Sequence, residues 1–307
     1  MTVEFRLVPD WEQPGYAHED VAAVAIDSRG RVHLHTRSEH RVSVHEPDGR
    51  FVTSWGGEHF VGAHGITIHD ELAYLVDDRA SAVRILDLDG GLVGRLEGPF
   101  DGCCNIAFAR NGDAYVADGY GHSSVHRFGP DGALTESWGS AGTGPGQFHT
   151  PHGIAVGPAL GLEEAVVVCD RENDRLQFFD LEGAYLDQWT DVQRPTDVVI
   201  GPDGLVHVAE LWRPVETGQA SRVHGMPTRD LPGRVSVYAP DGTVVARWGA
   251  DSERRGAPGN FIAPHGLAVD AEGSLYVAEV SGSFGAGAGR MASSDAIGHQ
   301  IQKFARV

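Results

Sequence analysis

The chain of 307 residues is built from copies of one repeat, each roughly forty residues long, and this feature constrains its fold more than any other. Six copies can be traced. The third is the best preserved and contains four short apolar segments joined by turns: Cys104–Phe108, Ala114–Asp118, Val125–Phe128 and Ala133–Trp138. Because a repeat of this size buries its faces only against its neighbours, the copies must pack on one another in series.

Turn residues separate the last two segments of most repeats. Pro-Asp-Gly stands at 47–49, 130–132 and 240–242, and Leu-Glu-Gly at 181–183 is a variant. Pro or Asp before Gly is typical of a turn between β strands, and no long segment has the 3.6-residue apolar period of a helix. The pattern predicts an all-β fold, a propeller of six four-stranded blades. The first strands of the blades are expected to begin near Ala22, His64, Cys104, His152, Thr196 and His265.

The two ends of the chain complement each other. The last repeat stops at its third segment, Gln300–Phe304, whereas the apolar segment Val3–Val8 precedes the first repeat. We therefore expect Val3–Val8 to complete the last blade. No linker interrupts the repeats, which predicts a single propeller domain over 1–307. Insertions at 213–233 and 282–298 follow the second strands of blades five and six, and we expect both on the face that carries the histidines.

Composition argues against several partner classes. The formal net charge is −19 and Lys303 is the only lysine, so no basic stripe is available for nucleic acid or an anionic membrane. No apolar stretch approaches the ~20 residues of a membrane span, and no secretory signal opens the chain. The cysteines, Cys103, Cys104 and Cys169, are odd in number and lack the spacing of a disulfide framework. These features predict a soluble, cytoplasmic protein and give no indication of its oligomeric state.

Three histidines share one local setting. His64, His152 and His265 are each followed by Gly and then by Ile or Leu, and they stand in the second, fourth and sixth repeats. A propeller would carry them to one place on its axis. Three neutral imidazoles without a fourth protein ligand are typical of a catalytic zinc site. The alternative is that His-Gly is only a favoured start of a blade. Cys104 aligns with the histidines but would break the threefold arrangement, and we interpret it as a bystander.

Three further residues are expected around the same mouth of the channel, because the end of a second strand lies beside the start of the first. Tyr120, Arg171 and Arg37 follow the second strands of blades three, four and one. Cations near a phenol lower its pKa, so Tyr120 is a candidate base, and arginine suits a carboxylate-bearing substrate. Alternatively, Tyr120 is a surface aromatic and the arginines pair with Asp77, Asp118, Asp170 or Glu210 in a structural ring.

These motifs resemble the NHL-repeat propellers, and more specifically the peptidyl-α-hydroxyglycine α-amidating lyase family. The similarity is densest over 115–120, 138–139, 145–148, 151–153 and 169–173, and weaker similarity covers nearly the whole chain. The resemblance implies one zinc per chain held by His64, His152 and His265, with Tyr120 as the catalytic base and Arg37 and Arg171 as active-site arginines. It also implies cleavage of a carbinolamide C–N bond to an amide and glyoxylate.

The chain departs from that family at several positions. The family's acidic calcium ligand after the third histidine is replaced by Gly266, so the pattern for a structural Ca²⁺ is incomplete, and Ala263 stands where the family has Met. The disulfides of the secreted lyases and their monooxygenase domain have no counterpart. We therefore expect a small α-hydroxy compound of bacterial metabolism as substrate, not a peptide hormone. The alternatives are a metal-dependent hydrolase or lactonase, which would use carboxylate and Asn ligands on the axis, and a non-catalytic binding scaffold.

Overall fold

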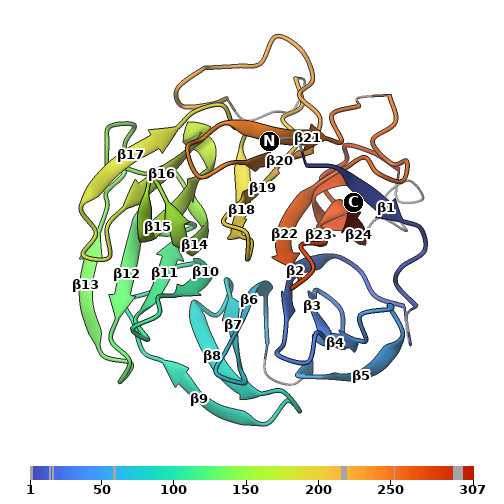
Figure 1. Cartoon of the computed structure of the whole chain (residues 1–307), viewed down its shortest axis with the longest axis horizontal. Coiled ribbons are helices and arrows are strands. Elements are labelled where there is room, and N and C mark those ends of the chain that lie inside the picture. The colour runs from blue at the N-terminus through green and yellow to red at the C-terminus, as the bar shows by residue number, and fades with distance from the viewer. Residues whose placement is uncertain are drawn as a thin grey trace.

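The computed structural model describes residues 3–13, 15, 17–57, 60–215, 220–251, 253–292 and 300–307. It contains six four-stranded antiparallel sheets arranged around a central axis as the blades of a propeller, as predicted (Figure 1). Within the described residues, no helix is long and apolar enough to cross a membrane.

Each blade is a meander whose first strand lies nearest the axis. Blades one to three comprise β2 (Val21–Ile26), β3 (Val32–Thr36), β4 (Val42–His45) and β5 (Phe51–Trp55); β6 (Ala63–His69), β7 (Leu72–Asp77), β8 (Ala82–Asp87) and β9 (Leu92–Leu96); and β10 (Cys103–Phe108), β11 (Ala114–Asp118), β12 (Ser124–Phe128) and β13 (Leu134–Trp138). Blades four to six comprise β14 (Pro151–Ala159), β15 (Leu162–Asp170), β16 (Arg175–Phe179) and β17 (Tyr185–Trp189); β18 (Pro195–Ile200), β19 (Val206–Glu210), β20 (Arg234–Tyr238) and β21 (Val244–Trp248); and β22 (Pro264–Val269), β23 (Leu275–Glu279), β24 (Ile301–Arg306) and β1 (Phe5–Val8).

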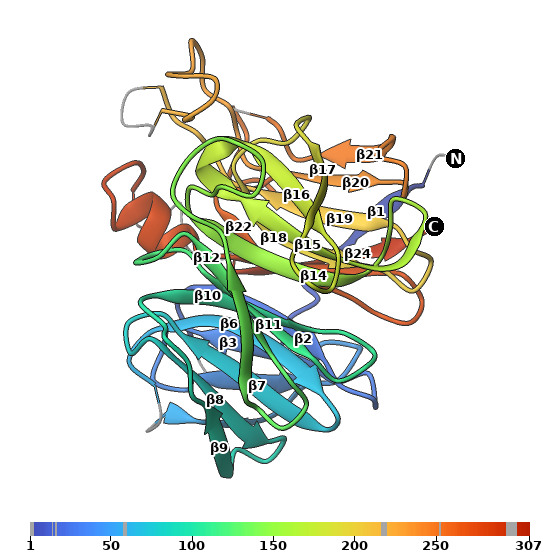
Figure 2. The same ribbon diagram turned by 90° about the vertical axis from the view of Figure 1, so that its left-hand side faces the viewer.

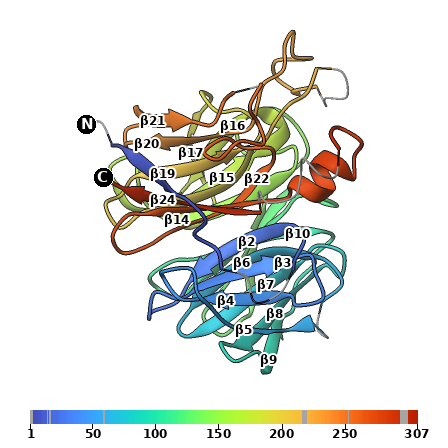
Figure 3. The ribbon, with the colours of Figure 1, turned by 90° about the vertical axis from the view of Figure 1, so that its right-hand side faces the viewer.

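The N-terminal strand completes the last blade. β1 pairs antiparallel with β24, with Phe5 opposite Arg306 and Val8 opposite Lys303 (Figure 3). The Phe5 ring also stacks on Trp248 of blade five at 5.1 Å between centroids, which ties the closing strand to the neighbouring blade. The predicted closure is therefore confirmed, although the regular strand begins at Phe5 instead of Val3.

Burial follows strand position within a blade. Four of the second strands, β3, β11, β19 and β23, are buried along their whole length, whereas outer strands such as β13 are mostly exposed. The predicted Pro-Asp-Gly turns place Gly132 and Gly242 in the left-handed region, at φ +78° and +86°. Trp189, which ends β17, packs against the Gly242 turn of the next blade, where an added Cβ would meet its indole at 3.0 Å. Apolar clusters between adjacent blades therefore form the core.

The two predicted insertions project from the same face of the propeller (Figures 2 and 3). The first contains isolated bridges between Arg213 and Leu231 and between Ser221 and Gly225, and the second begins with a short π-helix, η3 (Ser281–Ala286). Helices were not predicted, because six residues rich in glycine give no 3.6-residue period. Residues 216–219 of the first insertion and 293–298 of the second lie outside the described residues.

Candidate metal centre and its surroundings

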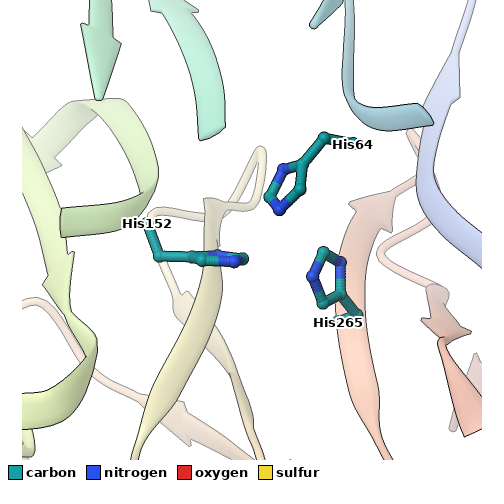
Figure 4. A group of neighbouring side chains, drawn as sticks. All are labelled: His64, His152 and His265. Atoms are coloured by element: carbon teal, nitrogen blue, oxygen red, sulfur yellow. The ribbon is translucent and has the colours of Figure 1, made fainter. Parts of the chain in front are cut away.

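The structure brings His64, His152 and His265 together on the axis (Figure 4). They come from β6, β14 and β22, the innermost strands of alternate blades. The three rings face one another with centroids 4.7–4.9 Å apart, and one nitrogen of each lies within 4.8 Å of the others. All three are buried, at 7% exposure or less.

A β-bulge at the start of each inner strand aims these side chains. In β6 the pairing with β7 shifts between Ala63 and Gly65, and in β22 the pairing with β23 shifts between Pro264 and Gly266. The histidine is the residue left out of register in both cases. A bulge turns one side chain out of the alternating pattern of a strand, so the imidazole can face the axis.

Backbone carbonyls fix the tautomer of every histidine. Nδ1 of His64 lies 2.6 Å from the Cys104 oxygen, Nδ1 of His152 lies 2.6 Å from the Thr196 oxygen, and Nδ1 of His265 lies 2.7 Å from the Ala22 oxygen. A carbonyl only accepts, so each Nδ1 carries the proton and donates it. The Nε2 lone pairs are therefore the ones directed to the axis, which is the second-shell arrangement typical of metal-binding histidines.

The glycine after each histidine is required by the approach of the next blade. A Cβ on Gly153 would lie 2.5 Å from the Cα of Asp197, and a Cβ on Gly266 would lie 2.6 Å from the Cα of Ala23. These are backbone atoms, so they cannot move aside. In each His-Gly pair the histidine is thus the candidate metal ligand, and the glycine lets the next blade pack closely. That next blade supplies the carbonyl that accepts the histidine Nδ1 proton.

The three imidazoles are held in their neutral form. Burial, followed by the charges of neighbouring groups, keeps the pKa of His64 and of His152 well below its ordinary value. For His265, burial and the Arg37 guanidinium lower the pKa to about 3. Neutral imidazole is the form that binds a metal ion.

Tyr120 reaches this cluster from the end of blade three. Its hydroxyl lies 3.0 Å from Nε2 of both His64 and His152, and because those nitrogens carry lone pairs, the phenol can donate its single proton to either one. The residue is 45% exposed, but its hydroxyl contacts two of the three buried histidines. Tyr120 is therefore more than a surface aromatic.

Arg171 holds the other side of the phenol. Its Nη1 donates to the Tyr120 hydroxyl at 3.3 Å, and its guanidinium carbon lies 5.4 Å from the ring centroid. Burial raises the pKa of Tyr120 above its ordinary value, and the Arg171 and Arg37 charges act against this rise. The sequence-based expectation of a lowered phenol pKa considered only the cations, and in the structure burial outweighs them.

A buried carboxylate that we did not predict holds Arg171 in place. Glu172 accepts from Arg171 Nε at 2.9 Å and from Arg194 Nη2 at 3.0 Å, and Arg213 lies 3.7 Å away. Burial raises the pKa of Glu172, but the three arginines outweigh it and lower the pKa to about 2. Neither Arg194 nor Arg213 belongs to a motif that repeats along the chain, so the sequence alone gave no signal for this cluster.

Arg37 lies on the opposite side of the channel mouth. It donates from Nη1 to the Ser283 hydroxyl at 2.5 Å and from Nε to the Ala63 oxygen at 3.4 Å, and Asp20 lies 3.6 Å from Nη1. The alternative that Arg37 and Arg171 pair with a ring of structural carboxylates was wrong. Those carboxylates have other partners: Asp77 pairs with Arg84, Asp170 with Arg175 and Glu210 with Arg234, and Asp118 faces two imidazoles.

A cavity of about 260 Å³ is lined by His265 and Tyr120 of this cluster, and we call it the mouth cavity. Part of the second insertion borders it through Ser283, Phe284 and Arg290. The lining residues are Arg37, Tyr120, Arg171, Arg194, Leu211, His265, Val280, Ser283, Phe284 and Arg290. A larger cavity of about 820 Å³ shares Arg37 and Ser283 with it. Four arginines and, among the described lining residues, no carboxylate face the mouth cavity, while Glu172 and Asp20 lie behind three of these arginines.

Below the histidines, the axis is filled by a polar pair. Asn105 donates from Nδ2 to Asp197 Oδ1 at 3.0 Å, and the Asp197 oxygens also accept from the backbone of Val198 and Leu267. The space beside them is only about 10 Å³. Cys104 contributes its carbonyl to this layer, and burial raises the pKa of its thiol to about 12, so no thiolate forms near the histidines.

Comparisons with known proteins identify relatives of the chain, while no family model matches it. NHL repeat-containing protein 3 of Homo sapiens is 28% identical over 308 residues, covering 90% of this chain and 81% of that protein. Peptidyl-alpha-hydroxyglycine alpha-amidating lyase 1 of Drosophila melanogaster is 30% identical over 258 residues, covering 76% and 45%. Peptidylglycine alpha-amidating monooxygenase of Rattus norvegicus is 27% identical, covering 55% and 21%, so the chain matches less than half of either amidating protein.

Solved structures share the architecture. A gluconolactonase from Xanthomonas campestris has a TM-score of 0.64 at 14% identity, covering 99% of this chain and 95% of that one. A streptogramin B lyase has a TM-score of 0.60 at 15% identity, covering 99% and 97%. At such identities the likeness shows the fold alone. The predicted resemblance is confirmed at the level of the relatives: the chain is a six-bladed propeller whose homologues include an NHL repeat-containing protein and amidating lyases.

Proposed function

We propose that the chain is a zinc-dependent lyase that cleaves the C–N bond of a small carbinolamide bearing a carboxylate. The observation that carries this proposal is the convergence of three Nε2 lone pairs on one point, with the Tyr120 hydroxyl 3.0 Å from two of them. The amidating lyases among its relatives support the reaction class.

The donor set fits zinc. Three neutral imidazoles leave further coordination positions to a substrate, which is the pattern of catalytic zinc sites. Among the described residues, His265 Nε2 has no hydrogen-bond partner although its Nδ1 is pinned. When bound, the ion would supply Lewis acidity to a substrate hydroxyl and a positive charge that lowers the pKa of nearby acids.

Tyr120 and Arg171 provide the acid–base chemistry. Tyr120, as the phenolate, accepts the proton of the substrate hydroxyl, and Arg171 stabilises that phenolate from 3.3 Å. The C–O bond becomes the aldehyde C=O as the C–N bond breaks, and its electron pair leaves with the nitrogen. The nitrogen takes up one proton, which Tyr120 can return. The products are therefore one amide and one aldehyde, with no net redox change.

The mouth cavity selects the substrate by charge. Arg37, Arg171, Arg194 and Arg290 line it, and guanidinium groups bind carboxylates through paired hydrogen bonds. Its volume of about 260 Å³ is below the range of roughly 300–1,000 Å³ typical of sites for drug-sized ligands, which favours a small acid. Arg37 is the best-placed carboxylate ligand, because Arg171 already contacts Tyr120 and Glu172.

The decisive experiment incubates zinc-loaded protein with α-hydroxyhippurate and measures glyoxylate. Tyr120→Phe keeps the ring and removes the ionisable hydroxyl, so we expect it to retain zinc while kcat falls by about 10²–10⁴. Arg37→Ala should raise KM for the acid far more than for its neutral amide. His152→Ala should lose both the zinc ion of the three-histidine centre and the activity.

Two results would overturn the proposal. One is a His152→Ala variant that keeps its full zinc content, which removes the three-histidine site. The other is the absence of any aldehyde product across a panel of carbinolamides with zinc-loaded protein. Hydrolysis of a lactone by the same preparation would then assign the site to hydrolase chemistry instead.

A further inference from the structure

Blade three differs from the other blades at the end of its second strand. In five blades this position is a carboxylate with 0% exposure, and in three of them a guanidinium lies beside it; the pairs are Asp77–Arg84, Asp170–Arg175 and Glu210–Arg234. Glu279 accepts instead from Gln302 and two backbone amides. Asp118 alone faces two imidazoles, His122 and His126. Blade three therefore lacks the permanent cation that compensates the same buried charge in blades two, four and five.

The distances between these groups match the spacing of ligands around a metal ion. Asp118 Oδ2 lies 3.1 Å from His122 Nδ1 and 3.4 Å from His126 Nε2, and one ligand atom from each residue lies within 4.8 Å of the others. Two ligands bonded at about 2.0–2.1 Å to a tetrahedral zinc are separated by about 3.4 Å. The cluster thus needs little movement to close around an ion.

The hydrogen-bond partners of His126 suit a metal ligand. Its Nδ1 lies 2.8 Å from the Ser137 hydroxyl, a partner of the kind that orients metal-binding imidazoles, while its Nε2 is the atom directed to Asp118. Asp118 Oδ1 is buried and, within the described part of the chain, has no hydrogen-bond partner. An unpaired buried carboxylate oxygen is costly, and a cation that contacts both carboxylate oxygens of Asp118 would satisfy it.

We propose that Asp118, His122 and His126 form a second metal site, which binds a divalent ion of the zinc class. Imidazole ligands exclude magnesium and calcium as the preferred ions. The His122 side chain is 50% exposed, so water can reach the site and complete the coordination. The site shares no residue with the three-histidine centre, and the proposal does not rest on the proposed function.

The second site would act on the turn that presents Tyr120. Asp118 ends β11, His122 and His126 lie just before and within β12, and Tyr120 stands between the first two ligands. The Tyr120 amide donates to the Gly102 oxygen at 3.1 Å, which already fixes one side of that turn. An ion that joins Asp118 to His122 would clamp the other side. We expect it to be a structural ion, which holds the phenol in place without contacting substrate.

Zinc titration of the full chain tests this proposal. Protein stripped with a chelator is titrated with Zn²⁺ against a chromophoric competitor, and two equivalents are expected. His122→Asn and His126→Gln should each abolish the zinc equivalent of the second site and keep that of the three-histidine centre. His152→Ala should abolish the equivalent of the three-histidine centre and keep that of the second site. His224→Asn is the matched control, because it removes an exposed imidazole far from either cluster in sequence.

The outcomes separate the two sites. If the wild-type chain and His122→Asn bind the same number of equivalents, the second site is refuted, and Asp118 is held by the Asp101 amide and the two imidazoles without an ion. If one equivalent is bound and His122→Asn loses it, the second site stands and the three-histidine zinc fails. His122→Asn alters an exposed side chain, so the test does not depend on whether His126→Gln folds. A Co²⁺ spectrum that changes in His122→Asn but not in His224→Asn would support imidazole ligation directly.

Discussion

Glu172 is a buried carboxylate among three arginines, and replacing it by Gln tests how Arg171 is held against Tyr120. The residue is 5% exposed, so its charge is poorly screened by solvent. Although burial raises its pKa, the arginines lower it from 4.5 to about 2. Each tenfold change in an acid constant is worth about 1.4 kcal/mol, so the charged form contributes about 3 kcal/mol to folding.

Glu172→Gln keeps the shape of the side chain and removes its charge. Breaking a buried ion pair from one side typically costs about 3–5 kcal/mol, because the remaining charge is left uncompensated. We expect the free energy of unfolding at pH 7, measured by urea denaturation, to fall by about 3 kcal/mol. Glu182→Gln is the control: that side chain is 72% exposed and lies 3.9 Å from Arg127, so its loss should change stability by less than about 0.5 kcal/mol.

The pH dependence gives an independent check of the same reasoning. A carboxylate whose pKa is lowered on folding stabilises the protein above its unfolded pKa and loses this effect as pH falls through its folded pKa. The difference between wild type and Glu172→Gln should therefore be full above pH 4.5 and shrink between pH 4.5 and about 2. A difference below about 1 kcal/mol at pH 7, or one that stays constant down to pH 2.5, would refute the argument.

One deletion and two substitutions test the frame of the site. Deleting residues 1–8 should lower stability by several kcal/mol, because it removes a four-residue ladder and the stack of Phe5 on Trp248, and an unchanged Tm would contradict closure. Gly153→Ala should cost about 1–3 kcal/mol and reduce zinc content through its clash with Asp197, whereas Gly94→Ala, which meets no atom within 4 Å, should do neither. Cys104→Ala should retain zinc, since only its carbonyl contacts His64.

The sequence was most informative where the repeat itself determines position. His64, His152 and His265 could be placed on one axis because equivalent residues of a propeller are related by rotation, whatever their separation along the chain. The inner strands begin one residue before the predicted starts, at Ala63 in β6 and at Pro264 in β22. The reason is that these residues already pair with the last residue of the second strand, Asp77 and Glu279 respectively. A pattern of apolar residues cannot show that pairing, because the paired residue precedes the apolar run.

Interactions between blades account for what sequence reasoning missed. Glu172 contacts Arg194 and Arg213 across the boundary of blades four and five, and neither arginine belongs to a motif that repeats. The phenol pKa of Tyr120 depends first on how deeply the group is buried, and burial comes from residues of several blades and not from the local sequence. The sequence indicated that nearby arginines lower the pKa of Tyr120. Whether burial raises that pKa by more than the arginines lower it depends on packing, which the sequence does not show.

The alternation of blades explains why three histidines, and not six, meet on the axis. Each imidazole needs an acceptor for its Nδ1 proton, and that acceptor is the carbonyl at the equivalent position of the following blade, at Cys104, Thr196 or Ala22. A histidine at one of those positions would point a fourth ring at a space where the centroids are already less than 5 Å apart. Odd-numbered blades therefore supply backbone acceptors and even-numbered blades supply ligands, so a sixfold scaffold produces a threefold site.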